Sequence, residues 1–406
     1  MSIYRFNDWK EYIGDENSLD KASDTVVIIL AFNQIEMVKS ISKFYEKQEI
    51  DVLFVDNNSN DGTYDFLKNT YCEKFNIIKT KENLGGAGGF AIGQEWAMSR
   101  KYDFCILTEE DALPIDKDII VELVKNKGIN KRVRAKFYEL NQPSFSLHFN
   151  LYPIWLFEKV GVMNKELFFR ADDWEFEQRL QKFLKTQPDF KTIDIDKKYS
   201  HPLIKKGFGM MANYFAIRNG LFVYSQFPKK NRLFDISRAV IKDLWNGFFT
   251  SMNDKQGTSL IQFKDGVEDA LAQKFPYKEK IDKFKTYKLE PTNYQYRELS
   301  IDDFINQYSK YTLKSELLLT SIIKDKFGNV SDSIVSGKYN GSGRVLAFFA
   351  KNIVFVEEID FINKKVIFIN YKNNRAKSIT KLSISLLLTL LISVFLIPYL
   401  MLNLKK

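Results

Sequence analysis

The feature that most constrains the fold is an alternation of short apolar runs with segments of helical periodicity over residues 25–107. The first run, residues 25–31, reads TVVIILA, and three runs of similar strand length follow at residues 51–55, 76–79 and 103–107. Helical spacing between the runs predicts helices at residues 35–45, 64–71 and 90–99. Strands that are apolar on both faces are typical of parallel sheets covered by helices on each side. The sequence therefore predicts an α/β fold.

Polar clusters follow the predicted strands, at the edge where ligands bind in open parallel sheets. Residues 56–63 read DNNSNDGT, and residues 83–90 read NLGGAGGF. Four glycines within five residues allow the backbone to approach a ligand, and a following helix N-terminus favours an anion. The stretch contains neither GxGxxG nor the GK[ST] of a phosphate-binding Walker loop. Turns of purely structural function are the alternative interpretation of both clusters.

Two acidic clusters are candidates for chemistry. Glu109, Glu110 and Asp111 follow the fourth strand, and such adjacent carboxylates persist most easily where a hard divalent cation neutralises them. An exposed acidic turn is the alternative. Residues 172–175 read DDWE at a predicted helix start, where acidic residues ordinarily act as caps. The sharper hypothesis is that one of these carboxylates is a general base.

The two histidines receive different interpretations. His201 follows a predicted strand at residues 191–195, and it would complete an Asp/Glu/His metal site. A lone histidine is more often structural, which is the interpretation adopted for His148.

The charge balance favours a membrane over nucleic acid as a partner. Lys and Arg number 60 against 51 Asp and Glu, giving a formal net charge of +9. These residues are spread widely without a long basic block, and they are denser before the C-terminal apolar segment. The two cysteines, Cys72 and Cys105, form no disulfide framework and favour a reducing compartment. The N-terminus has no apolar region typical of a secretory signal.

Residues 382–404 are almost wholly apolar. As a helix they would cover roughly 34 Å, enough to cross a bilayer core. More basic residues precede the segment than follow it, which predicts that the N-terminal part lies in the cytoplasm. Pro398 is tolerated in such a helix. A buried terminal helix is the alternative interpretation.

The rest of the chain is less regular. Helices are expected from residue 236, at 260–275 and at 316–326, and short antiparallel strands at 344–350, 353–359 and 366–371. The predicted organisation has five parts: an N-terminal extension (1–23), a catalytic domain (24–230), a helical extension (231–290), an accessory α+β region (291–378) and a membrane helix (379–404).

Taken in this order, these motifs resemble the family 2 glycosyltransferases of the GT-A fold, a Rossmann-like α/β architecture. The resemblance covers roughly residues 24–250, and NLGGAGGF, the acidic triplet and DDWEF carry it. It is similar to the bacterial branch with galactofuranosyltransferases and some rhamnosyltransferases. The resemblance implies inverting, metal-dependent transfer from a nucleoside diphosphate sugar.

The resemblance also implies roles for individual residues. Donor binding would fall to Asn33, Asp56, Asn83, Gly85, Gly86, Glu110 and Arg218, the last within a Tyr214-x-x-x-Arg218-Asn219 element. Glu109 and Asp111 would take the acidic DxD positions and, with His201, hold Mn²⁺ or Mg²⁺. Asp173 would be the catalytic base. The family usually has Asp where this chain has Glu109 and Glu110, which changes metal geometry and weakens metal dependence.

The expected function is the transfer of galactofuranose from UDP-galactofuranose to a lipid-linked or polysaccharide acceptor in cell-surface glycan assembly. The expected location is the cell membrane, with the catalytic domain on the cytoplasmic side. Rhamnosyl transfer from dTDP-rhamnose and a catalytically inactive sugar-nucleotide- or glycan-binding protein are the alternatives. A nucleotidyltransferase ranks below them, because residues 31–34 read AFNQ rather than a glycine-rich basic loop.

Overall fold

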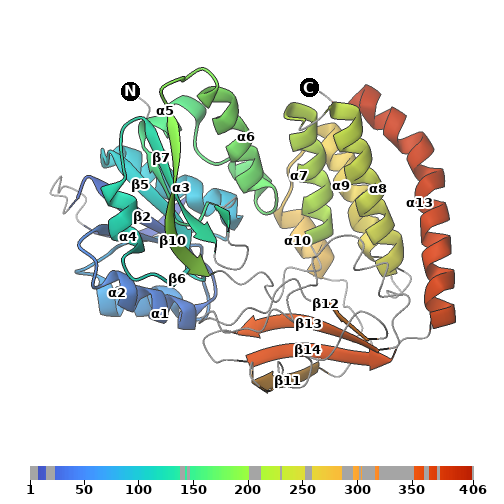
Figure 1. The fold of residues 1–406 in the computed structure, drawn as a ribbon, viewed down its shortest axis with the longest axis horizontal. Helices are drawn as coiled ribbons and strands as arrows, with labels where there is room; N and C mark the ends of the chain where they lie inside the picture. Colours follow the sequence, from blue (N-terminus) through green and yellow to red (C-terminus); the bar gives the residue numbers. More distant parts are fainter. Residues whose placement is uncertain are drawn as a thin grey trace. The chain divides into compact units, whose positions relative to one another are not determined.

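The computed structural model describes residues 8–14, 23–137, 142–143, 147–200, 212–228, 231–251, 258–285, 296–300, 303, 316–319, 352–360, 365–372 and 375–404. The chain divides into two compact units, Met1–His201 and Pro202–Lys406 (Figure 1). The boundary between the units lies after residue 201, whereas the predicted catalytic domain ends at residue 230. The end of the catalytic domain at residue 230 therefore stays a prediction.

A sheet with a parallel centre forms the N-terminal unit (Figure 1). Its four central strands, in spatial order, are β4 (Asn76–Thr80), β3 (Asp51–Asp56), β2 (Thr25–Ala31) and β5 (Phe104–Glu109). Around them lie β1 (Trp9–Ile13), β9 (Asn150–Pro153), β7 (Lys131–Phe137), β10 (Lys191–Ser200), β6 (Leu113–Pro114) and β8 (Gln142–Pro143). The β1–β4 and β5–β9 pairs are antiparallel. The predicted α/β fold with a mostly parallel sheet is confirmed.

Helices cover both faces of this sheet because side chains alternate between the faces along each strand. Val27 and Ile29 of β2 belong to a core shared with α1 (Ile35–Tyr45), α2 (Thr63–Tyr71) and α4 (Ile119–Lys125). Their neighbours Val26 and Ile28 belong to a second core, which is shared with α3 (Gly85–Ser99), α5 (Trp155–Val160) and α6 (Asp172–Leu184). A short 3-10 helix, η2 (Lys165–Leu167), precedes α6.

The glycine-rich stretch is helical, and α3 begins five residues before the predicted start at residue 90. Glycine inside α3 lets the helix lie close to β2. A Cβ atom at Gly93 would lie 2.4 Å from Cγ2 of Ile28, and one at Gly89 would lie 2.2 Å from Cδ1 of Leu30. These two glycines therefore serve the packing of helix on sheet.

Four helices of the C-terminal unit share one apolar core: α7 (Ala212–Gln226), α8 (Arg232–Ser251), α9 (Thr258–Ala272) and α13 (Arg375–Asn403). Helix α10 (Lys278–Lys285) follows α9, and its Lys280 and Lys283 pair with Asp265 of α9. Among the described residues, one segment is long and apolar enough to cross a membrane, Ser383–Asn403 of α13, and only 22% of its most apolar window is buried.

The C-terminal unit also contains a four-stranded sheet in the order β11 (Tyr296–Ser300), β14 (Lys365–Lys372), β13 (Asn352–Asp360), β12 (Glu316–Leu319). The expected strands at 353–359 and 366–371 are confirmed as an antiparallel pair. The helix expected at 316–326 is wrong at residues 316–319, which pair in parallel with β13. Periodicity does not separate helix from strand in so short an apolar run. Residues 320–326 and the strand expected at 344–350 lie outside the described residues.

Candidate active site

The candidate site lies at the carboxyl ends of the central strands. The parallel register sets Ala31 of β2 beside Asp56 of β3, and Leu30 beside Glu109 of β5. The loops that follow also bond to β2, since the Asn57 N–H donates to the Ala31 carbonyl at 2.8 Å and the Glu110 N–H to the Leu30 carbonyl at 3.0 Å. Polar groups from separate parts of the sequence therefore meet at one edge of the sheet.

Asp56 is fully buried at the end of β3. Its Oδ2 accepts the Ser59 N–H at 3.2 Å, whereas its Oδ1 has no hydrogen-bond partner among the described residues. Burial raises the pKa of this carboxyl. A buried oxygen without a donor costs about 1–3 kcal/mol, so this atom is suited to accept a hydrogen bond from a ligand.

Asn33 is exposed beside this aspartate. It adopts a left-handed backbone with φ 52°, its N–H donates to Oγ of Ser59 at 3.0 Å, and its Oδ1 accepts the Asn60 N–H at 2.8 Å. These bonds hold the loop after β2 against the loop after β3.

Asn57 fixes the start of α3. Its Nδ2 donates to Oδ1 of Asn83 at 3.1 Å and to the Gly85 carbonyl at 2.9 Å, and its Oδ1 accepts the Leu84 N–H at 2.9 Å. Gly85 has φ 69°, and a Cβ atom there would lie 1.9 Å from the carbonyl oxygen of Phe168. The close approach that glycine allows at this position is therefore to the protein's own backbone.

Two side chains of the acidic triplet accept hydrogen bonds from Gln34, which lies between β2 and α1. Glu110 and Asp111 are both buried. Nε2 of Gln34 donates a hydrogen bond to Glu110 at 3.0 Å and a longer one to Asp111 at 3.4 Å. Glu109 is the accessible member, with 20% of its side chain exposed, and its Oε2 lies 4.0 Å from Nε2 of His148. Glu109 thus presents the carboxylate that a ligand can reach.

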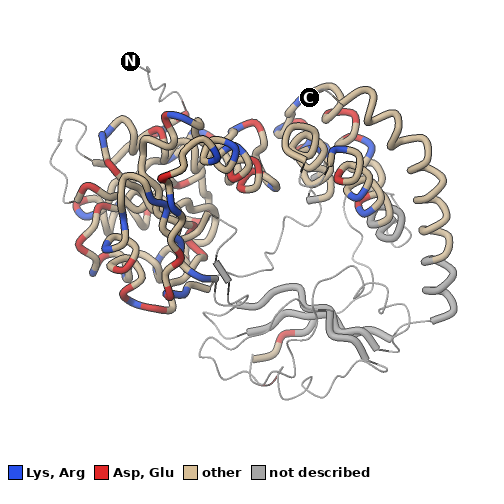
Figure 2. Tube along the Cα trace, turned by 45° about the horizontal axis from the view of Figure 1, so that its top comes forward, with Lys and Arg blue, Asp and Glu red and all other residues tan. Residues whose placement is uncertain are grey.

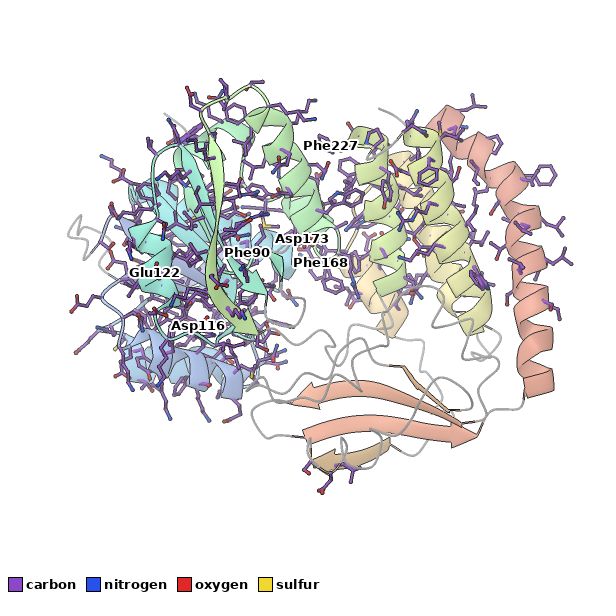
Figure 3. The ribbon with its side chains drawn as sticks, in the orientation of Figure 1. Phe90, Asp116, Glu122, Phe168, Asp173 and Phe227 are labelled. Carbon is purple, nitrogen blue, oxygen red and sulfur yellow. The ribbon has the colours of Figure 1, made fainter. Side chains whose placement is uncertain are left out.

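The two aspartates at the N-terminus of α6 lie within the electrostatic field of the triplet. Burial raises the pKa of Asp172 to about 8, and the charges of Asp173 and Glu109 add to this shift. Burial also raises the pKa of Asp173, as does Glu109, while the Trp174 N–H and Arg170 act in the opposite direction. Glu109 therefore acts on both aspartates, so the base candidate and the acidic triplet share one site (Figure 3 labels Asp173).

The glycine stretch borders the same place. A Cβ atom at Gly86 would lie 3.2 Å from Oδ2 of Asp172, and the Ala87 N–H donates to the Phe168 carbonyl at 3.3 Å. Phe168 and Arg170 both have positive φ values in the turn before α6. This turn brings the first residues of α3 and of α6 together.

The donor chemistry of this cluster suits Mg²⁺ or Mn²⁺, since its acidic side chains supply hard oxygen ligands. Burial raises the pKa of Asp172 and of Asp173, and the charge of Glu109 adds to both shifts; a bound cation would lower these pKa values. Within the described part of the chain, no group of three His, Cys, Asp or Glu side chains is arranged to hold an ion. The predicted third ligand, His201, lies outside the described residues.

Arg218 lies in α7, in the other compact unit. It is fully buried, its Nε donates to Oδ1 of Asn219 at 2.7 Å, and its guanidinium lies over the rings of Tyr214, Phe215 and Phe275. The structure thus places the Tyr214–Arg218–Asn219 element in a different unit from the other predicted donor residues.

Gln34, Asn57 and His148 lie at the site but were not singled out from the sequence as site residues. Asn57 belongs to the polar cluster of residues 56–63, so its position in the sequence does indicate a place in the site. Gln34 and His148 carry no motif, and His148 was interpreted as structural. Only the pairing of distant segments brings these two side chains to the acidic triplet.

Comparison with known proteins supports sugar transfer as the reaction class. Residues 26–120 match the model of the family "Glycosyl transferase family 2". The match spans β2 to the start of α4, and hence Asp56, the glycine stretch and the acidic triplet. It identifies a glycosyltransferase domain in the N-terminal unit. No curated protein matches the chain.

One solved structure to which the chain is similar comes from Desulfovibrio desulfuricans G20, and its description assigns it provisionally to the nucleotide-diphospho-sugar transferases. It is 6% identical, covers 51% of this chain and 89% of its own, and has a TM-score of 0.33. At that score the likeness supports no argument about this chain.

Proposed function

We propose that this glycosyltransferase transfers a sugar from a nucleoside diphosphate donor with inversion at the anomeric carbon, and that Asp173 is its general base. The observation that supports the proposal is that Asp173 is close enough to Glu109 for that charge to add to the effect of burial in raising the pKa of Asp173. A carboxylate that would bind the metal and one that would act as the base would then belong to a single site, as an in-line displacement requires.

The reaction needs a proton acceptor beside the attacking hydroxyl. Asp173 takes the proton of the acceptor hydroxyl while that oxygen bonds to the anomeric carbon. The bond from this carbon to the diphosphate oxygen breaks, and its electron pair leaves with the nucleoside diphosphate. The raised pKa of Asp173 increases its affinity for the proton, which favours this transfer near neutral pH.

The donor would be held by groups at the strand ends. Asp56 would accept a hydrogen bond from the nucleoside through its buried Oδ1, with Asn33 and Asn83 beside it. Gly86, Gly85 and Glu110 would line the diphosphate, and Arg218 remains a donor-binding candidate on the resemblance alone. Glu109, Asp111 and His201 would hold Mn²⁺ or Mg²⁺, which when bound neutralises charge on the leaving diphosphate.

The favoured donor is UDP-galactofuranose, because the glycine stretch at residues 83–90 resembles that of the galactofuranosyltransferases. The favoured acceptor is a lipid-linked or polysaccharide glycan in cell-surface assembly. The apolar helix α13 supports a site of action at the cell membrane, and the basic residues beside it favour the anionic cytoplasmic leaflet, which supports a cytoplasmic catalytic domain.

A donor screen tests the proposal. The full-length protein is incubated with a lipid-linked glycan acceptor, Mn²⁺ or Mg²⁺, and either UDP-galactofuranose or dTDP-rhamnose. Released nucleoside diphosphate and the mass of the acceptor are then measured. Release of UDP together with a gain of one hexose by the acceptor supports the proposal. Release of dTDP with a gain of one deoxyhexose would instead identify dTDP-rhamnose as the donor. Chelation of the metal is expected to suppress either signal.

Glutamate at the first two positions of the acidic triplet favours one competing function, an inactive protein that binds sugar nucleotides or glycans. The extra methylene moves each carboxylate and weakens a fixed metal geometry. Calorimetric binding of UDP without turnover on any supplied donor and acceptor would favour that function over catalysis.

A further inference from the structure

Helix α13 packs against α8 and runs antiparallel to it (Figure 1). Arg232, the first residue of α8, donates from its guanidinium to the carbonyl oxygens of Met401 at 3.4 Å and of Leu404, so the end of α13 is fixed at the start of α8. The buried residues of α13 recur at helical spacing on one face: Ser385, Thr389, Ser393, Leu400 and Leu404. Leu400 and Leu404 share a core with α7, α8 and α9.

The opposite face of α13 is apolar and uncovered. Its exposed side chains include Leu387 at 58%, Val394 at 67%, Phe395 at 78% and Leu402 at 85%. Residues 382–404 contain no Lys, Arg, Asp or Glu, and the part of α13 that is drawn in colour in Figure 2 is tan throughout. A face of this size and composition requires an apolar partner.

Helix α8 cannot accompany α13 across a bilayer. It carries five ionisable residues: Arg232, Asp235, Arg238, Lys242 and Asp243. Charged side chains are strongly unfavourable near the bilayer centre, and α8 also shares its core with α7 and α9. A membrane-spanning α13 would have to leave α8 and expose the residues that α8 now buries.

We propose that α13 is an in-plane membrane anchor, with its exposed face in the outer part of one leaflet and its Ser385–Thr389–Ser393 face on α8. An interfacial helix normally carries its own charged face, and here α8 supplies that face. Lys377 and Lys381 precede the apolar segment and Lys405 and Lys406 follow it. Lying in the plane keeps both basic ends at the same layer of anionic headgroups, each lysine contributing attraction.

This proposal rests on the membrane association in the proposed function and adds the mode of attachment. It excludes a helix that crosses the bilayer, because both ends of α13 stay on the side of the membrane from which the protein binds.

The test uses full-length protein with Cys72→Ser, added to preformed vesicles of phosphatidylglycerol and phosphatidylcholine. Lys377→Cys and Lys406→Cys are introduced separately, and a membrane-impermeant maleimide is applied from outside. Asp65→Cys, at an exposed position of α2, reports full accessibility. We expect equal labelling at all three positions before and after detergent. Labelling of Lys406→Cys only after detergent would show a crossing helix and overturn the proposal.

A second pair of variants tests which surface meets the lipid. Phe395→Asp replaces an exposed side chain of α13 and is expected to weaken vesicle binding at least tenfold. Val121→Asp, at a 57% exposed position of α4, makes a similar change elsewhere and should leave binding unchanged. Unaltered binding of Phe395→Asp, or a dimer in solution that Phe395→Asp dissociates, would overturn the proposal. Nucleotide release measured on the same samples separates a failure of the anchor from a failure of the proposed catalysis.

Discussion

At the scale of single residues, Asp173 is the group whose chemistry the proposed function needs most. Asp173→Asn keeps the shape of the side chain but cannot accept the acceptor's proton. General base catalysis contributes about 10²–10⁴-fold, so we expect the turnover rate to fall by that factor while UDP binding persists. Asp65→Asn, at an exposed position in the first turn of α2, is the matched control and should keep wild-type turnover. Near-normal turnover of Asp173→Asn would exclude Asp173 as the base.

Asn57 is expected to affect donor binding indirectly, by holding the residues at the start of α3 in place. Asn57→Ala removes three hydrogen bonds that fix Asn83, Leu84 and Gly85. Because buried partners are left unsatisfied, we expect a loss of about 1–3 kcal/mol in unfolding free energy and weaker donor binding. Asn69→Ala, at an exposed position of α2, should change stability by less than about 0.5 kcal/mol. Denaturant titration and calorimetry measure both quantities, and equal behaviour of the two variants would contradict this role.

At the scale of elements, the contact between α3 and β2 depends on glycine. Alanine has the higher helix propensity, by about 1 kcal/mol, but at Gly93 its methyl group would meet Ile28 at 2.4 Å. Overpacking costs about 1–3 kcal/mol, so Gly93→Ala is expected to destabilise the N-terminal unit. At Gly220 of α7 a Cβ atom meets nothing within 4 Å, so Gly220→Ala should stabilise its helix. Hydrogen exchange in α3 and α7 reports each change, and slower exchange in α3 of Gly93→Ala would contradict the packing argument.

The junction of α9 and α10 predicts a dependence of stability on pH. Burial opposes the ionisation of Asp265, but hydrogen bonds from Lys283 at 2.5 Å and Lys280 at 3.0 Å lower its pKa overall. A lowered folded-state pKa stabilises the protein above the ordinary aspartate pKa, and this contribution is lost as pH falls through the folded value. We expect α10 to lose exchange protection on acidification in wild type, and Asp265→Asn to lack that component. An identical acid profile in both proteins would contradict the assignment.

At the scale of the whole molecule, the chain has two compact units, and Arg218, which the resemblance implies binds the donor, lies in α7 of the second unit. Arg218→Lys keeps the charge but loses the planar group that lies over Tyr214 and Phe215. If Arg218 contributes to donor binding, the dissociation constant for UDP should rise about tenfold in Arg218→Lys, at temperatures where α7 keeps its exchange protection. An unchanged constant would assign the donor to the N-terminal unit alone.

The sequence by itself determined the parallel α/β sheet, since continuous apolar strands and amphipathic helices leave few other ways to bury those side chains. It also placed Asp56, Glu109 and Asp111 at strand ends, because the carboxyl ends of parallel strands share one edge. It did not reveal that β12 is a strand, because a four-residue apolar run has no decisive period and its pairing with β13 decides the matter.

Tertiary structure alone decided which polar groups meet. The pairing of strands distant in sequence brings Gln34 and His148 to the acidic triplet, and the turn before α6 brings Asp172 to Gly86. It likewise decided that one face of α13 packs on α8, whereas hydropathy records only that the segment is apolar. Composition and hydrophobic periodicity are local properties of a chain, whereas contacts between distant segments depend on how the chain folds.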